Sequence, residues 1–155
     1  MIELVLVMAL LVAAVSVVAP MLASFFRGRT LDSEARRLLA LTHAGQSRAV
    51  SEGMPMLLWV DASQHAYGLE REGASREGDP RAEEFVLADN VQLDAANATP
   101  VPVGGQRLPA IRFLPDGSVD ESSPPVLRLS GADGSTLWLV EAANHQDYAI
   151  QNSDR

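Results

Sequence analysis

The feature that most constrains this chain is an uncharged apolar run near its N-terminus. From Leu4 to Phe26 the sequence reads LVLVMALLVAAVSVVAPMLASFF. An α-helix rises about 1.5 Å per residue, so a run of more than about 18 such residues matches the hydrocarbon core of a bilayer. A secretory signal peptide would have a shorter apolar core and a small-residue cleavage site. The run therefore predicts a single transmembrane helix, and a helix buried in a globular core is the less suitable alternative for a chain of this size.

Length, cysteine content and charge limit the number of domains and the kinds of site and partner that this chain can have. The chain has 155 residues, enough for one domain with a core of its own. It has no cysteine, which excludes disulfides, a thiol nucleophile and zinc–thiolate sites. The formal net charge is -8, and a phosphate backbone needs a concentrated basic surface. We therefore expect no nucleic acid partner.

Glu3 directly precedes the apolar run. Placing a carboxylate in a bilayer costs about 2.5–3.5 kcal/mol of insertion free energy at the centre of a helix and less near its end. Such a residue is therefore normally present because it interacts with a specific partner. No cationic side chain precedes it in the sequence, so the partner is expected from another molecule. The alternative is a carboxylate that reaches the aqueous interface.

Orientation poses a separate problem. Arginines follow the run at positions 27, 29, 36 and 37, and none precedes it. If the chain started at Met1, the positive-inside rule would place the acidic remainder in the cytoplasm.

Pro20 lies near the far end of the run. Proline lacks an N–H and crowds the carbonyl four residues earlier, at Ser16, so it should bend or loosen the helix rather than end it. An ordinary proline in a membrane helix is the alternative reading.

These N-terminal features together resemble those of type IV pilins and type II secretion pseudopilins. The matching features are Met1-Ile2-Glu3-Leu4, the apolar span and a proline seventeen positions after Glu3. In that family a basic leader ending in glycine is cut before Phe-Thr-Leu-Ile-Glu-Leu, and the new terminal amine is methylated. The resemblance implies that the natural start lies upstream of Met1. It also implies an N-terminus in the cytoplasm and a periplasmic C-terminal head, anchored by a single pass in a bacterial inner membrane. Glu3 and Pro20 become assembly residues, with Glu3 facing the terminal amine of a neighbouring subunit.

Beyond Phe26 the helical pattern continues. Small and apolar residues recur at steps of three and four, which predicts a stripe that packs against a sheet: Leu31, Ala35, Leu38, Thr42, Gly45 and Ala49. The opposite face carries polar residues, with Asp32 and Arg36 spaced for an ion pair. Gly53 and Pro55 should stop the helix. A helix from Ile2 to Glu52 would be about 75 Å long.

The remainder of the sequence predicts short strands separated by turns. Residues 56–61 and 65–69 should form a hairpin, and 70–84 an exposed loop. Residues 85–93 should be one interrupted strand or a tight hairpin, and 94–107 a turn-rich connector. Further strands are expected at 110–114, 126–130, 136–140 and 148–150.

The expected fold class is α+β, with a long N-terminal transmembrane helix packed on an antiparallel sheet, in a lollipop shape. Its parts would be a transmembrane half at 1–26, a periplasmic half of the same helix at 27–53, and a β-rich head at 54–155.

This order of elements resembles the GspH/FimT subfamily of H-type minor pseudopilins. The similar stretches are SEARRLLAL, AVSEGMPMLLWVD and IRFLPDGSV. The resemblance implies a structural subunit at or near the tip of the periplasmic pseudopilus, which helps to export folded proteins. Its partners would be other major and minor pseudopilins, the prepilin peptidase, the inner-membrane assembly platform and membrane lipid. One alternative is a FimT-like minor pilin of a type IV pilus or DNA-uptake machinery, and another is a membrane-tethered periplasmic binding or enzymatic domain.

The sequence offers little support for catalysis. His43, His65 and His145 do not have metal-ligand spacing, and no serine lies in a G-x-S-x-G elbow. Acidic residues at 116, 120 and 121 could hold calcium, although they lack the spacing of a calcium loop and turn chemistry accounts for Asp116. We therefore expect no enzyme activity, no metal and no cofactor. Trp59 and Trp138 are expected in the sheet core, or at a subunit contact if exposed.

Overall fold

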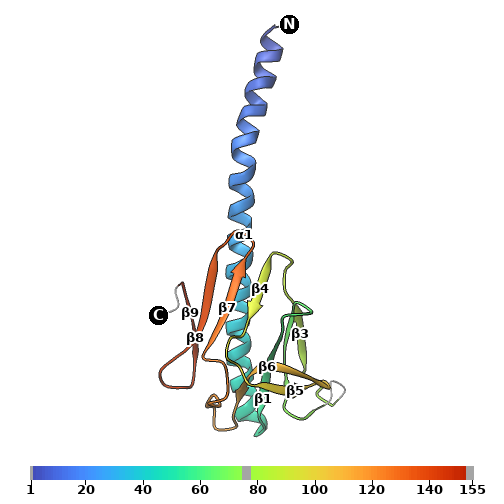
Figure 1. Cartoon of the computed structure of the whole chain (residues 1–155), viewed down its shortest axis with the longest axis vertical. Coiled ribbons are helices and arrows are strands. Elements are labelled where there is room, and N and C mark those ends of the chain that lie inside the picture. Colours follow the sequence, from blue (N-terminus) through green and yellow to red (C-terminus); the bar gives the residue numbers. More distant parts are fainter. Residues whose placement is uncertain (1, 75–77, 153–155) are drawn as a thin grey trace.

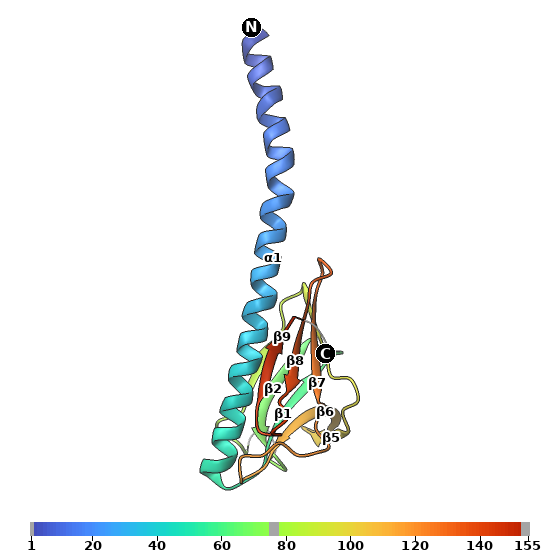
Figure 2. The same ribbon diagram turned by 90° about the vertical axis from the view of Figure 1, so that its left-hand side faces the viewer.

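A single long helix, α1 (Ile2–Glu52), dominates the shape of the molecule (Figure 1). The computed structural model describes residues 2–74 and 78–152, without the side chains of residues 2 and 17–28. The N-terminal half of α1 projects away from a β-rich head as a rod (Figures 1 and 2). The helix continues through residue 20, so Pro20 does not end it, although its side chain lies outside the described residues.

The helix ends where the sequence predicts. Gly53 has φ 64°, the left-handed conformation that glycine adopts readily after a helix. Among the residues described with their side chains, no helix is both long and apolar enough to span a membrane.

Nine strands form the head in two antiparallel sheets. The five-stranded sheet has the order β3-β2-β1-β6-β5, and the four-stranded sheet has the order β4-β7-β8-β9. The strands are β1 (Met56–Asp61), β2 (Ala66–Arg71), β3 (Glu83–Val86), β4 (Val91–Asp94), β5 (Pro100–Val103), β6 (Gln106–Phe113), β7 (Val126–Gly131), β8 (Thr136–Glu141) and β9 (Tyr148–Gln151). Figure 2 shows α1 on one side of the head, with the strands of both sheets on the other.

The apolar sequence of β1 is explained by burial of both faces. All six of its residues are buried. Alternate residues Met56, Leu58 and Val60 join the main core, which also contains residues of α1. Leu57 and Trp59 belong to a second, smaller cluster with Val103 and other residues. The predicted hairpin is confirmed, since β1 pairs with β2.

The prediction for residues 85–93 is wrong. They are neither one interrupted strand nor a hairpin, because β3 pairs with β2 while β4 pairs with β7 in the other sheet. Leu87, between the two strands, is buried in the main core and anchors the segment that crosses from one sheet to the other, although Val86 and Asp89 on either side of it are exposed.

The connector predicted at 94–107 is also wrong, because it contains β5 and the start of β6. These strands pair in a hairpin across Gly104 and Gly105, which have φ 54° and 88°. Two-residue hairpin turns require such positive φ values, which glycine tolerates. The prolines of β5 are tolerated because this strand is at the edge of its sheet.

The six residues predicted as the packing stripe of α1 are all buried in the structure. Gly45 marks a close approach of the helix to the sheets. A Cβ atom at this position would lie 2.8 Å from the Phe113 ring and 3.0 Å from Leu69. The absence of a side chain thus lets α1 lie directly on the core.

Candidate functional site

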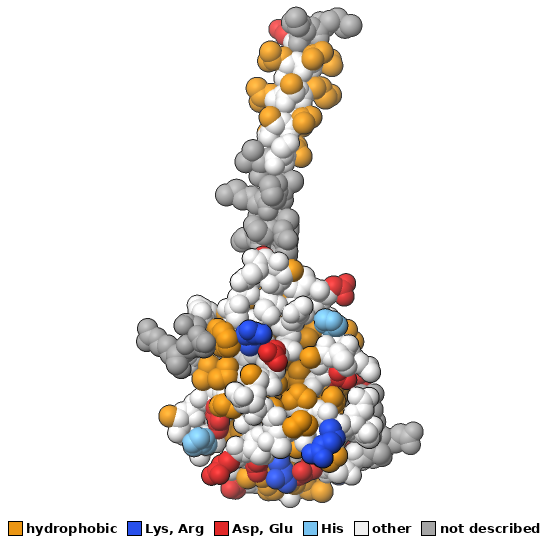
Figure 3. All heavy atoms as spheres, in the orientation of Figure 1, with side chains coloured by type: hydrophobic (Ala, Val, Ile, Leu, Met, Phe, Trp, Pro, Cys, Tyr) orange, Lys and Arg blue, Asp and Glu red, His pale blue; other side chains and the backbone are white. Residues whose placement is uncertain are grey.

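The most unusual surface of the molecule is the exposed apolar side of the N-terminal rod. Nine large apolar side chains between Leu4 and Val15 are each 55–68% exposed. Figure 3 shows apolar side chains along both edges and the visible face of the upper part of the helix. A continuous apolar surface of this kind marks a site of contact with protein or membrane.

Glu3 lies at the N-terminal end of this surface and is exposed. No ion pair joins it to any residue that the structure describes. A partner for its carboxylate would have to come from outside this part of the chain.

The C-terminal half of α1 is fastened to the head by buried charged groups. The carboxylate of Asp79 accepts hydrogen bonds from Nη2 of Arg48, at 3.0 Å to each oxygen, and from the main-chain N–H groups of Arg71 and Arg81. Arg48 also pairs with Glu52 at 3.0 Å. Burial alone would raise the pKa of Asp79, but these donors outweigh it and hold the pKa below its ordinary value.

A second buried link between α1 and the head lies nearer the middle of α1. The hydroxyl of Tyr67 donates to Oε2 of Glu34 at 3.0 Å, and Arg37 pairs with the other oxygen at 3.2 Å. Burial, and then the Glu34 charge, raise the pKa of Tyr67. Sequence reasoning missed both links, because their partners lie 31 and 33 residues apart with no local signal to connect them.

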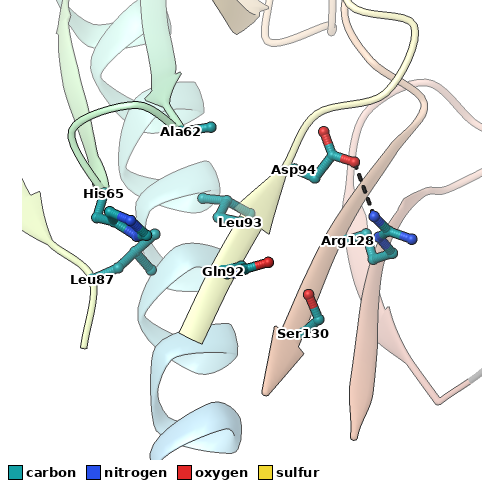
Figure 4. A pocket seen from close by; sticks show the side chains of 8 residues that line it. All are labelled: Ala62, His65, Leu87, Gln92, Leu93, Asp94, Arg128 and Ser130. Carbon is teal, nitrogen blue, oxygen red and sulfur yellow. Dashed lines mark hydrogen bonds and ion pairs between the residues drawn. The ribbon is translucent and has the colours of Figure 1, made fainter. Parts of the chain in front are cut away.

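The head also has a groove between its two sheets, with a volume of about 370 Å³. Figure 4 shows β4 along one side, and His65 and Leu87 on the other. Asp94 and Arg128 lie at its border and form an ion pair of 3.2 Å.

The three histidines considered as possible metal ligands do not lie together in one site. His65 lines the groove, His43 is exposed on α1, and Nδ1 of His145 lies 2.9 Å from Oε1 of Glu141. Within residues 2–74 and 78–152, no group of three potential metal ligands was found.

The acidic residues considered for calcium are engaged in local turns. Asp116 accepts from the main chain and hydroxyl of Ser118, and Asp120 accepts from Ser122 and from Arg112. These turns are ordinary for aspartate followed two residues later by serine.

The two tryptophans differ. Trp59 is buried, in agreement with the prediction. Trp138 is only half-buried and lies beneath the guanidinium of Arg128, 6.0 Å from the ring centroid, so its assignment to the core is wrong. Its neighbour Leu139 takes the inward position of β8 instead.

Comparison with known proteins gives a family and two similar folds. The family model described as "Type II transport protein GspH" matches residues 34–144. A search of curated proteins finds no match.

Two solved structures share the fold. The minor pseudopilin EpsH from the type 2 secretion system of Vibrio cholerae is 14% identical, with a TM-score of 0.50 over 81% of this chain and 96% of EpsH. The type IV minor pilin FimU of Pseudomonas aeruginosa is 15% identical, with a TM-score of 0.53 over 84% of this chain and 92% of FimU. The family match covers most of the head and the adjoining helix, and this chain therefore belongs to the GspH family of type II transport proteins.

Proposed function

We propose that this protein is a minor pseudopilin of a type II secretion system, a structural subunit at or near the tip of a periplasmic pseudopilus. The observation that carries the proposal is the exposed apolar rod from Leu4 to Val15, which continues into a helix packed on the head. Membership of the GspH family supports the same role.

In this proposal, residues 1–26 of α1 lie in the inner membrane before assembly and in a bundle of helices afterwards. Both environments would cover the apolar surface that the isolated molecule leaves exposed. The helical half at 27–53 and the head at 54–155 would lie in the periplasm. Partners would be other pseudopilins through α1, together with the prepilin peptidase and the inner-membrane assembly platform.

Glu3 has a specific role in this assembly. Its carboxylate would meet the terminal amine of a neighbouring subunit, so that two charges that are costly in lipid neutralise each other. Pro20 would allow α1 to bend within the bundle. The protein would act by binding its neighbours and would catalyse no reaction.

The experiment that tests this role exchanges Glu3 for Gln in the full chain. The variant keeps the size and shape of the side chain but removes the charge. We expect it to be lost from pseudopili sheared from cells, and secretion to fall. Asp32→Asn on the same helix is the matched control, because Asp32 is exposed and outside the apolar surface.

The outcomes separate the proposal from its alternatives. If Glu3→Gln is incorporated as well as the unchanged chain, the filament role is wrong and a membrane-tethered periplasmic domain is favoured. If incorporation is lost but pilus assembly or DNA uptake fails instead of secretion, the protein is a FimT-like minor pilin.

A further inference from the structure

A smaller pocket lies between the β1–β2 turn and the β5–β6 turn, and we call it the turn pocket. Its volume is about 190 Å³. The residues that line it are Trp59, Asp61, Gln64, Ala66, Glu84, Val103, Gly104, Gln106 and Leu108. None of these residues lines the groove between the two sheets. Figure 2 shows β5 and β6 on the side of the head away from α1, so the turn pocket is separate from the packing of the helix.

The β5–β6 hairpin forms one wall of the turn pocket because it folds back over β1. In the five-stranded sheet, β6 separates β5 from β1. Val103 at the end of β5 nevertheless packs with Trp59 and Ala66 in the second core cluster. Side chains alternate along a strand, so Asp61 lies on the same face of β1 as Trp59. The turn pocket therefore has the end of β1 on one side and the β5–β6 turn on the other.

Asp61 brings a carboxylate without a basic partner into this pocket. The residue is only 7% exposed. Its Oδ1 accepts from the hydroxyl of Ser63 and from the main-chain N–H groups of Ser63 and Gln64. The bond from the Ser63 hydroxyl outweighs burial and holds the pKa of Asp61 below its ordinary value, so the group is charged at neutral pH. Within the described part of the chain, Oδ2 accepts from no donor, and it is not sealed from solvent.

The rim of the turn pocket adds a second carboxylate and two neutral amides. Glu84 of β3 and the side chains of Gln64 and Gln106 line the pocket and are exposed. Among the described residues that line it, none is Lys, Arg or His. The lining therefore carries two negative charges and presents oxygen acceptors from several sides. Such a lining complements a cation and repels an anion.

The size of the pocket and the number of its acceptors favour the guanidinium group of an arginine. A volume of about 190 Å³ is less than the about 300–1,000 Å³ of small-molecule sites, so it suits a single side chain. A guanidinium has five N–H donors in one plane and can bond to acceptors on several sides at once. The ammonium of lysine has three donors and is more strongly hydrated, so it loses more on entering the pocket.

We propose that the turn pocket binds an arginine side chain of a partner polypeptide, whose guanidinium bonds to Oδ2 of Asp61 and to the carboxylate of Glu84. Hydrogen bonds between two charged groups are about twice as strong as neutral ones, so Asp61 gains more from this donor than from water. The free carboxylate of a single amino acid would be repelled by both groups, which favours an arginine within a chain. The pocket belongs to the head alone, so the proposal does not depend on the role of α1 in assembly.

Titration of the full chain in uncharged detergent micelles tests the proposal, with the indole ¹H–¹⁵N signals of the two tryptophans as the readout. The probe is Ac-Gly-Arg-Gly-NH2, and Ac-Gly-citrulline-Gly-NH2 is its uncharged isostere. Trp59 lines the turn pocket, whereas Trp138 lies on β8 in the other sheet. We expect the arginine peptide to shift the Trp59 signal saturably and to leave Trp138 unchanged. The citrulline peptide should bind at least about fivefold more weakly.

Matched variants locate the site. Asp61→Asn keeps the oxygen that accepts from Ser63 and removes the charge, so it should weaken binding of the arginine peptide by about fivefold or more. Asp116→Asn is the control and should have no effect, because Asp116 accepts from Ser118 in the same way at an exposed turn elsewhere. Glu84→Gln, an exchange at an exposed position, should also weaken binding. Unchanged affinity in Asp61→Asn and Glu84→Gln would contradict the proposal.

Other results would also overturn it. The absence of a saturable Trp59 shift, or equal binding of the citrulline peptide or of Ac-Gly-Lys-Gly-NH2, would exclude recognition of a guanidinium. Tighter binding of free L-arginine than of the blocked peptide would indicate a small-molecule site. A Trp59 shift that depends on protein concentration without peptide would show that a second copy supplies the arginine. Glu3→Gln should leave the peptide affinity unchanged, so a failure of the filament role would be distinguishable.

Discussion

Gly45 of α1 lies so close to Phe113 of β6 that a Cβ atom at position 45 would come within 2.8 Å of Cδ2 and Cε2 of the ring. The same atom would lie 3.0 Å from Cδ1 of Leu69. Both neighbours are fully buried, so neither has room to move away. Gly45 therefore sets how closely the helix can pack on the head.

Gly45→Ala should destabilise the protein despite the better helix propensity of alanine. The propensity gain is about 1 kcal/mol, whereas overpacking a filled core costs about 1–3 kcal/mol. We expect a net loss of about 1–2 kcal/mol, from an overpacking cost in the upper part of this range, measured by denaturant unfolding of the full chain in detergent. Ser47→Ala, on the exposed face of the same helix, should change the stability by less than about 0.5 kcal/mol. An unchanged stability of Gly45→Ala would contradict the close packing.

Removing the charge of Asp79 should loosen the connection between α1 and the head. Asp79→Asn leaves the Arg48 guanidinium, whose side chain is 12% exposed, with the Glu52 carboxylate as its charged partner and the main-chain carbonyl of Arg81 as a neutral acceptor. We expect a loss of about 2–3 kcal/mol in the free energy of unfolding at neutral pH. Asp32→Asn, which removes one partner of an exposed pair, should cost less than about 1 kcal/mol.

The effect of Asp79 should depend on pH in a defined direction. The folded-state pKa lies below the ordinary value of 3.8, so the stabilisation is complete above pH 3.8 and is lost as the pH falls through the folded pKa. The difference between the unchanged chain and Asp79→Asn should therefore shrink in acid. A difference that stays constant from pH 7 to pH 2 would show that the carboxylate charge does not contribute.

Local signals account for the elements that the sequence predicts well. The helix from Ile2 to Glu52 follows from the uncharged apolar run, from the periodicity beyond Phe26 and from the stop at Gly53 and Pro55. Likewise, β1 is a continuous apolar run, and the structure contains it at residues 56–61. In each case the information lies within a few residues of the element itself.

Errors arose where distant parts of the chain decide the outcome. β3 and β4 follow each other closely, but their partners β2 and β7 place them in different sheets. β5 contains two prolines, and these led to the prediction of a loop. The pair Gly104-Gly105 is nevertheless typical of a two-residue hairpin turn, and the prediction did not use this signal. The groove could not be foreseen either, because it exists only where the two sheets lie beside each other.

Tyr67→Phe should destabilise the head by removing one buried hydrogen bond to a charged group. Tyr67 is fully buried and donates to Glu34, whose other carboxylate oxygen pairs with the half-exposed Arg37. We expect a loss of about 1.5–2 kcal/mol in the free energy of unfolding. Tyr148→Phe is the matched comparison, because its hydroxyl donates to the neutral carbonyl of Pro124, and it should cost about 1 kcal/mol.

Tyr67 should also affect stability in alkali. Its folded-state pKa is raised above the ordinary value of 10.0, so its contribution is complete below pH 10 and is lost as the pH rises further. Unfolding measured between pH 8 and pH 11 should show a shallower decline for Tyr67→Phe than for the unchanged chain. Some decline should remain, because burial also raises the pKa of Tyr148. Equal slopes would contradict the assignment.

Gly68→Ala should disturb the packing of Trp59 on the five-stranded sheet. A Cβ atom at position 68 would press against the main-chain oxygen of Glu83 and lie 2.5 Å from Cζ2 of Trp59. Because Gly68 lies between Trp59 on β1 and Glu84 on β3 in register, the ring occupies the space that a side chain would need. We expect a loss of about 2–3 kcal/mol in the free energy of unfolding and a red shift of Trp59 fluorescence, measured in a Trp138→Phe background.

Gly134→Ala tests the opposite case, because Gly134 has φ 82° but open space around it. It should lower stability through backbone strain by about 1 kcal/mol without shifting the emission of Trp59. Emission that shifts in neither variant would mean that the indole does not depend on the gap left by Gly68.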